Sequence, residues 1–139
     1  MSDPDLRIAV IVDASLPIGL LANTVAVVGI GLGGALPVLA GTPLVDADAR
    51  TVRTSANRPM PVLQATPETI AALLARALPT PDGAVVVPFP RFARDPRRFE
   101  DYLNQFPRRR LAGEAIDGLG LCGPEKWVRS LTGSLKLLR

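Results

Sequence analysis

The sequence predicts an α/β domain in which layers of helices and strands alternate. Two short runs rich in β-branched residues, Leu6–Val12 and Ala84–Val87, carry apolar residues on both faces, which is typical of strands buried inside a sheet. Segments with helical periodicity alternate with such runs, and this order favours an α/β architecture. The length of 139 residues fits a single domain, residues 1–139, because no repeat or linker divides it.

The composition excludes several kinds of chemistry. The chain has no histidine and one cysteine, so one copy cannot form a zinc site from the usual nitrogen and sulfur ligands. The same absence removes Ser-His and Cys-His nucleophile pairs. Lysine chemistry is limited to Lys126 and Lys136. We therefore expect no metal and no cofactor, and an enzyme would depend on carboxylates, amides, hydroxyls and backbone groups.

The expected location is the cytoplasm. Cys122 has no second cysteine with which to pair, so nothing indicates an oxidising compartment. The first segment, Met1–Arg7, is short and acidic, whereas a secretory signal has a basic start followed by an apolar core. The mean hydropathy is positive, at +0.25, and this apolar excess is consistent with a homodimer.

Residues 14–45 contain no charged side chain. We expect Ser15 to cap a helix that begins near Leu16 and has Pro17 in its first turn. The glycines between positions 31 and 34 are expected to end it. This stretch is therefore interpreted as a buried helix that leads into a glycine-rich turn.

Two other interpretations of the uncharged stretch are less favoured. About 20 apolar residues span a membrane, but Pro17, Asn23 and Thr24 interrupt this stretch and neither basic residues nor aromatic residues flank it. Gly29–Gly34 matches the dinucleotide pattern G-x-G-x-x-G, which requires a strand before it and a helix after it. Two prolines in the following segment, 35–43, do not permit that helix. We expect neither a membrane span nor a nucleotide site.

Prolines and capping residues mark the elements that follow. Leu44-Val45 and Pro61–Gln64 are predicted strands, and Asp46 to Asp48 is predicted to be a solvated turn rather than a metal site. Thr66-Pro67-Glu68 begins a helix with an N-cap and a proline at its first position. Its apolar positions fall on one face: Ile70, Leu73, Leu74 and Ala77.

The last third of the chain repeats this pattern. A helix is expected after Asp95-Pro96, with Phe99, Tyr102 and Phe106 on one face in the core. Ala115–Cys122 is the last predicted strand. A short helix begins at Glu125, and its inward residues are Trp127, Val128 and Leu131.

Positive charge is concentrated between Arg91 and Arg110, where seven arginines accompany three acidic residues. Arginines next to aromatic residues are typical of RNA-binding surfaces, on which bases stack. The helical spacing of the aromatic residues here places them in the core, where they cannot stack on bases. A solvated basic face is therefore the favoured interpretation, and Arg108, Arg109 and Arg110 are the candidate nucleic-acid contacts.

Both ends of the sequence resemble the peptidyl-tRNA hydrolase type II superfamily. Val10–Asp13 and Leu16–Gly19 are similar to that family's first strand and loop, and Leu119–Pro124 is similar to its closing strand. Over nearly the whole chain the sequence is more closely similar to a bacterial offshoot, domain of unknown function number two thousand, through Asp13–Asn23 and Leu131–Arg139. The resemblance implies a three-layer α/β/α fold with a four-stranded mixed sheet.

The hydrolase residues do not carry over with this resemblance. The hydrolase family keeps a lysine where this chain has Leu20, and a glutamine and a histidine where it has Asn23 or Thr24 and then Val27. Its Asp-Ala-Gly motif corresponds to Leu111–Gly113, without the carboxylate. The resemblance therefore implies the scaffold without the hydrolase chemistry.

A few polar groups remain at the corresponding place. Asp13 follows the first strand, which is a usual ligand position in α/β sheets. Ser15 and the amides of the next helix can bind an anion, and a buried Asn23 must be hydrogen-bonded. Each has a structural alternative, as a loop cap, an N-cap and a core amide. The candidate ligand-binding residues are Asp13, Ser15, Gly19, Asn23 and Thr24.

The sequence favours a ligand-binding or interaction protein and assigns no catalytic residue. The expected partners are a second copy and a small-molecule or RNA ligand, with no membrane. Two alternatives from other classes stay open. One is a hydrolase of peptidyl-tRNA or a related ester that uses Asp13 and Asn23. The other is RNA binding through Arg91–Arg110.

Overall fold

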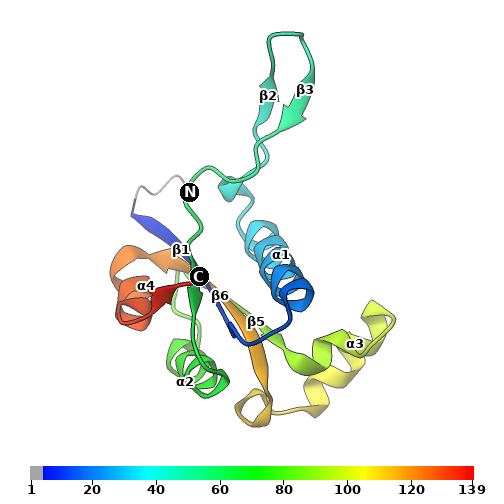
Figure 1. The fold of residues 1–139 in the computed structure, drawn as a ribbon, viewed down its shortest axis with the longest axis vertical. Helices are drawn as coiled ribbons and strands as arrows, with labels where there is room; N and C mark the ends of the chain where they lie inside the picture. The colour runs from blue at the N-terminus through cyan, green and yellow to red at the C-terminus, as the bar shows by residue number, and fades with distance from the viewer. Residues whose placement is uncertain (1–4) are drawn as a thin grey trace.

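The computed structural model describes residues 5–139, and a five-stranded mixed sheet forms its centre (Figure 1). The strand order is β5-β6-β1-β4-β7. The strands are β1 (Leu6–Val12), β4 (Val62–Gln64), β5 (Val85–Pro90), β6 (Ile116–Pro124) and β7 (Lys136–Leu137). β1 and β4 are parallel, and the other pairs are antiparallel. Most of the N-terminal segment used to argue against a secretory signal, residues 1–4, lies outside the described residues.

The predicted four-stranded sheet is wrong by one strand, because the sheet has five. Residues Lys136 and Leu137 pair with Gln64 and Leu63 at the edge of β4 and add a fifth strand. A strand of two residues is too short to show the period-two pattern that identifies strands in a sequence. The rest of the pairing follows the predicted strands, with β1 held between β4 and β6 in the middle of the sheet.

Helices cover both faces of the sheet (Figure 1). Side chains alternate along β1, so Ile8, Val10 and Val12 point to one face and Ala9 and Ile11 to the other. The first set packs with α1 (Ile18–Ala35), and the second with α2 (Pro67–Ala77) and α4 (Glu125–Thr132). These contacts make three layers, with β1 buried on both sides as its sequence predicts.

The helix α1 differs from expectation at its start. It begins at Ile18 with Pro17 at the N-cap position, and Ser15 makes no cap hydrogen bond to it. Its last residue is Ala35, close to the expected end. Because residues 29–34 lie inside this helix, they cannot form the turn of a dinucleotide site, which excludes that interpretation.

By length and composition α1 is apolar enough to cross a membrane, with a mean hydropathy of 1.8, and 17% of it is buried. Its buried line is Thr24, Val28 and Leu32, which face the sheet. Gly120 on β6 permits this contact, because a Cβ there would lie 2.5 Å from Val28 Cγ1. The helix is therefore a surface helix with one narrow buried face, and the interior helix expected from the sequence is not observed.

A β-hairpin extends from the body beyond the C-terminal end of α1 (Figure 1). It consists of β2 (Pro43–Val45), which was expected, and β3 (Thr51–Arg53), which was not. The Asp46 carboxylate accepts hydrogen bonds from the backbone N–H groups of Asp48 and Arg50 and from Arg50 Nε. The bonds from Arg50, backbone and then side chain, lower the pKa of Asp46. The turn is thus a self-contained polar loop.

The segment after β5 departs most from expectation. β5 runs through Pro88 and Pro90 because it is an edge strand, where a missing N–H is tolerated. A 3-10 turn, Arg91–Arg94, follows, and α3 (Phe99–Gln105) begins four residues after Asp95. Phe99 is 67% exposed, so its predicted place in the core is wrong. Tyr102 and Phe106 instead form a small cluster with Phe92.

The helices α2 and α4 agree with the sequence. Thr66 Oγ1 accepts the backbone N–H of Thr69 at the start of α2, and the predicted apolar face of this helix is buried. Val128 and Leu131 of α4 are buried and Trp127 is half-buried. Strong start signals and regular spacing explain why these two helices were predictable.

Candidate functional site

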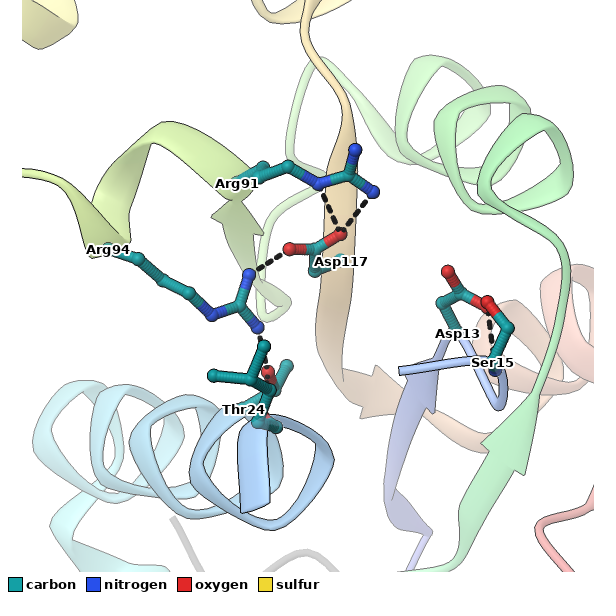
Figure 2. A network of polar contacts seen from close by, with 7 residues as sticks. Asp13, Ser15, Thr24, Arg91, Arg94 and Asp117 are labelled. Atoms are coloured by element: carbon teal, nitrogen blue, oxygen red, sulfur yellow. Dashed lines mark hydrogen bonds and ion pairs between the residues drawn. The ribbon is translucent and has the colours of Figure 1, made fainter. Parts of the chain in front are cut away.

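Asp13, directly after β1, organises the loop that leads into α1. Its Oδ1 accepts hydrogen bonds from the Ser15 backbone N–H at 2.9 Å and from Ser15 Oγ at 2.7 Å (Figure 2). The Asp13 N–H donates to the Asp117 carbonyl oxygen at 3.3 Å. A side chain that bonds its own backbone two residues on is a loop cap. Asp13 is buried, and both of these hydrogen bonds are made to its Oδ1. Gly19 lies exposed in the first turn of α1.

A second carboxylate, Asp117 on β6, is fully buried. Its Oδ1 accepts from Arg91 Nε at 3.2 Å and from Arg91 Nη2 at 3.0 Å, and its Oδ2 accepts from Arg94 Nη1 (Figure 2). A buried carboxylate is stable only when it is paired and hydrogen-bonded in this way. The hydrogen bond and the charge of Asp117 raise the pKa of Arg91. Asp117 is therefore the electrostatic centre of this end of the sheet.

Thr24 connects α1 to this ion pair. Its hydroxyl donates to the Leu20 carbonyl oxygen at 2.7 Å and accepts from Arg94 Nη2 at 2.6 Å. Thr24 is fully buried, whereas Asn23 is exposed, so the expected buried amide at Asn23 is wrong. Successive residues on a helix differ by about 100° in direction, and position 24 faces the sheet while position 23 faces solvent.

The ion pair formed by Asp117 with Arg91 and Arg94 contains more hydrogen-bond donors than acceptors. Arg94 Nε is buried and has no hydrogen-bond partner within residues 5–139. The Arg94 Cζ atom lies 5.0 Å from the centroid of the Phe89 ring, which places the guanidinium over an aromatic face. Two arginines therefore converge on Asp117, and one of them contacts the wall of a neighbouring cleft.

That cleft lies between α1, β5 and α3 and has a volume of about 620 Å³. Val27 and Gly31 of α1, Val87 and Phe89 of β5, and Tyr102 of α3 are among the residues that line it. At Gly31 an added Cβ would lie 2.8 Å from Val87 Cγ1, so the absence of a side chain there permits the close approach of helix and strand.

The charged side chains that line the cleft are all cationic among the described residues. Of the described residues that line it, Arg97 and Arg98 carry charge and none is acidic. Both arginines are exposed, at the end of the cleft formed by the segment that precedes α3. The cleft therefore offers an apolar wall with a cationic edge.

The other candidate residues lie elsewhere. Arg108, Arg109 and Arg110 are exposed in the segment after α3. Arg109 pairs with Glu114 at 3.1 Å, and its Cζ lies 4.2 Å from the centroid of the Phe92 ring. The structure thus brings Asp13, Ser15 and Thr24 to one end of the sheet and leaves the arginine run on a separate segment.

Asp117, Arg91 and Arg94 are not among the ligand-binding candidates that the sequence predicts. A signal was present, because an aspartate inside the apolar run Ile116–Cys122 is stable in a central strand only with a positive partner. The cluster of arginines after β5 supplies that partner. Cys122 lies buried in the same strand, and desolvation raises the pKa of its thiol.

Comparisons with other proteins place the chain in a family. A family model described as "Protein of unknown function (DUF2000)" matches residues 6–139. The chain belongs to this family. No curated protein is significantly similar to it. A DUF2000 relationship agrees with the closer of the two resemblances read from the sequence, that to domain of unknown function number two thousand.

A solved structure has the same fold. It is a protein of unknown function from Agrobacterium tumefaciens, and it superposes with a TM-score of 0.85 over 96% of this chain and 97% of its own. The sequence identity is 20%, so this likeness shows the fold alone. The mixed α/β architecture of this DUF2000 chain is therefore shared with an independent structure.

Proposed function

We propose that the protein binds a small amphipathic anion in the cleft between α1, β5 and α3. The apolar part of the ligand lies against Val27, Val87 and Phe89, and its acidic group lies at Arg97 and Arg98. The observation that carries this proposal is the charge of the cleft, which is apolar in its walls and exclusively cationic at its edge among the described residues.

The size and lining of the cleft support small-molecule binding. Ligand pockets typically measure about 300–1,000 Å³ and combine apolar walls with a few polar groups that orient the ligand. The cleft, at about 620 Å³, falls in this range. An anion gains a charge-assisted contact with guanidinium groups, whereas a cation is repelled.

The polar groups near the end of β1 support binding rather than hydrolysis. Asp13 is bonded by Ser15, Asp117 by two arginines, and Thr24 by Arg94. A general base must be free to reach the proton it removes. Both carboxylate oxygens of Asp117 are held by arginines, and Oδ1 of Asp13 is held by Ser15. Val27, at the position where the resemblance to peptidyl-tRNA hydrolase type II implies a histidine, is a wall residue of the cleft. That superfamily placement stays a prediction.

Asp117 acts in this proposal as a positioning residue. It holds Arg91 and Arg94, the first and last residues of the turn that leads into Pro96–Phe99, and this segment forms part of the cleft. The ion pair thereby fixes where Arg97 and Arg98 lie relative to α1. A loss of Asp117 is expected to weaken binding through the position of the cleft wall.

The test is a calorimetric titration with decanoate and with decan-1-ol, two probes that share an apolar chain and differ in charge. We expect decanoate to bind the wild-type protein more tightly than the alcohol. The double substitution Arg97→Ala with Arg98→Ala is expected to weaken decanoate binding by about tenfold, which corresponds to the loss of one charge-assisted contact.

The matched control is Arg108→Ala with Arg110→Ala, which removes the same charge from the neighbouring segment. We expect this control to bind decanoate like the wild type. Equal weakening in both double variants, or no binding of decanoate, contradicts the proposal. Cleavage of peptidyl-tRNA by the wild type that is lost in Asp13→Ala also contradicts it and favours the hydrolase alternative.

A further inference from the structure

The outward face of α1 is uncovered. Ala22, Ala26 and Ile30 lie opposite the buried line Thr24, Val28 and Leu32, and all three are exposed. Ile30 is 74% exposed, and Ile18 at the start of the helix is 86% exposed. The whole helix is uncharged. A surface helix of a monomeric protein normally carries charged residues on its solvent face, and α1 carries none.

The apolar surface continues on the side of α1 that faces away from the proposed ligand cleft. There a groove of about 450 Å³ separates the helix from the segment 55–60. Ala26, Gly29 and Gly33 of α1 line one wall of this groove, and Met60 and Leu39 line the other. The outward face of α1 is thus one edge of a wider apolar area.

The β2–β3 hairpin provides a second uncovered apolar surface. Leu44 and Val52 are directly opposite each other in the hairpin register, and they are 50% and 58% exposed. Val45 is 66% exposed. The hairpin extends away from the body (Figure 1), and these side chains are at least half exposed. An extended arm of this kind with exposed apolar residues fits a partner molecule.

We propose that a second copy of this chain covers both surfaces. The two α1 helices pack antiparallel across a two-fold axis through their outward faces, and each hairpin lies against the start of the partner's α1. Because α1 is about 27 Å long and the hairpin projects beyond its C-terminal end, an antiparallel partner brings its own exposed N-terminal end to the hairpin.

The residues of α1 suit contact with an identical helix. Alanines and glycines at positions 22, 26, 29 and 33 permit two backbones to approach closely. A two-fold interface brings the same surface patch of each copy together, so a charged patch would repel itself. The uncharged α1 avoids this repulsion, and antiparallel helices also have opposed dipoles.

The exposed apolar area is sufficient for a stable dimer. Six large apolar side chains on α1 and the hairpin are 41–86% exposed, and together they equal about four wholly exposed side chains, or roughly 200–450 Å². A standard interface buries about 800 Å² per partner, a little over half of it apolar. These six side chains, with the exposed Ala22 and Ala26 beside them, supply about half or more of the apolar area that such an interface needs.

A membrane surface fits the same helix less well. Helices that lie on membranes carry basic residues along a polar face, and residues 14–45 contain no basic residue. A second copy is therefore the occupant that the uncharged face favours. Ile30 lines the ligand cleft as well as the outward face of α1. The dimer is tested by molar mass and the ligand by calorimetry, so the two proposals can fail independently.

The test is the molar mass of the full chain by sedimentation equilibrium, with Ala26→Glu as the disrupting variant. We expect the wild type to have the mass of two chains at roughly 100 μM, where a micromolar Kd gives mostly dimer. We expect Ala26→Glu to have the mass of one chain. The matched control is Ala72→Glu, which places the same charge on the exposed face of α2 and is expected to remain dimeric.

A second variant tests the hairpin without altering α1. Leu44→Thr with Val52→Thr keeps residues that favour strands and is expected to raise the dimer Kd by about tenfold or more. A wild type with the mass of one chain, an Ala26→Glu variant that stays dimeric, or an unchanged Kd in the hairpin variant contradicts the proposal. Sedimentation of a monomeric wild type with phosphatidylglycerol vesicles also contradicts it and favours the membrane.

Discussion

Arg94 and Asp117 form an ion pair inside the protein although they are 23 residues apart in the chain. Asp117 lies on β6, which is next to the edge strand β5 in the sheet, and Arg94 lies in the turn that follows β5. The pair joins the segment 91–113, which leaves the sheet, to the sheet's central part. This contact fixes the wall of the cleft to which we assign ligand binding.

Replacement of the buried carboxylate tests this role. Asp117→Asn leaves two guanidinium groups without a counter-charge, and breaking a buried pair in this way is expected to cost about 3–5 kcal/mol of unfolding free energy. Arg91 is 57% exposed, so Arg91→Ala is expected to cost about 1 kcal/mol or less. Urea unfolding of both variants measures the difference. Similar losses in the two variants contradict the account.

Thr24 and Asn23 provide a test on adjacent helical positions. Thr24→Val keeps the shape of the side chain but leaves Arg94 Nη2 without its acceptor, which is expected to cost about 1–3 kcal/mol. Asn23→Ala changes an exposed side chain and is expected to change stability by less than about 0.5 kcal/mol. Thermal or urea unfolding checks both. A larger loss at Asn23 than at Thr24 would restore the interpretation drawn from the sequence.

Substitutions at two glycines distinguish the effect of close packing on stability from the effect of helix propensity. Gly120→Ala places a Cβ 2.5 Å from Val28 Cγ1 and 3.1 Å from Leu32 Cδ1, so it is expected to destabilise the protein by about 1–3 kcal/mol. Gly34→Ala meets no atom within 4 Å and is expected to stabilise it by about 0.5–1 kcal/mol. The denaturant midpoints of unfolding, compared at equal m-values, measure the change in stability of each variant. Changes of the same sign in the unfolding free energies of both variants would contradict this assignment of close packing to Gly120.

Cys122 is expected to be unreactive in the folded protein. Burial in β6 raises the pKa of its thiol, and the thiolate is the reactive form. At pH 8 an aromatic disulfide reagent should react slowly with the native chain and quickly after denaturation. Because the unfolded chain loses this proton at lower pH, the contribution of Cys122 to stability decreases as the pH rises past the ordinary thiol pKa. Rapid labelling of the native protein would contradict its burial.

The elements predictable from sequence are those with strong local signals. β1 is a continuous β-branched run, and α2 has a capping threonine, a proline at its first position and regular apolar spacing. Such signals act within a few residues and do not depend on the rest of the chain. The strand β7, by contrast, consists of two residues whose pairing with β4 is decided by the fold as a whole.

The site was less predictable because its partners are distant in sequence. Asp13 and Ser15 are two residues apart, and the expected loop cap at Asp13 is observed. Asp117 depends on arginines 23 and 26 residues away, and no local pattern shows that contact. The helix α1 was expected to be interior because it lacks charge, and its exposure follows only from the arrangement of the layers. That exposure is the basis of the proposed dimer.

The most direct test of the proposed function is a two-dimensional NMR titration of the isotope-labelled protein with decanoate. Amide signals of Gly31, Val87 and Phe89, which line the cleft, should shift with a common saturation curve. Signals of Leu73 and Leu74 on the opposite face of the sheet should stay constant. Shifts confined to residues outside the cleft, or none at millimolar decanoate, would contradict the assignment of this cleft as an anion-binding site.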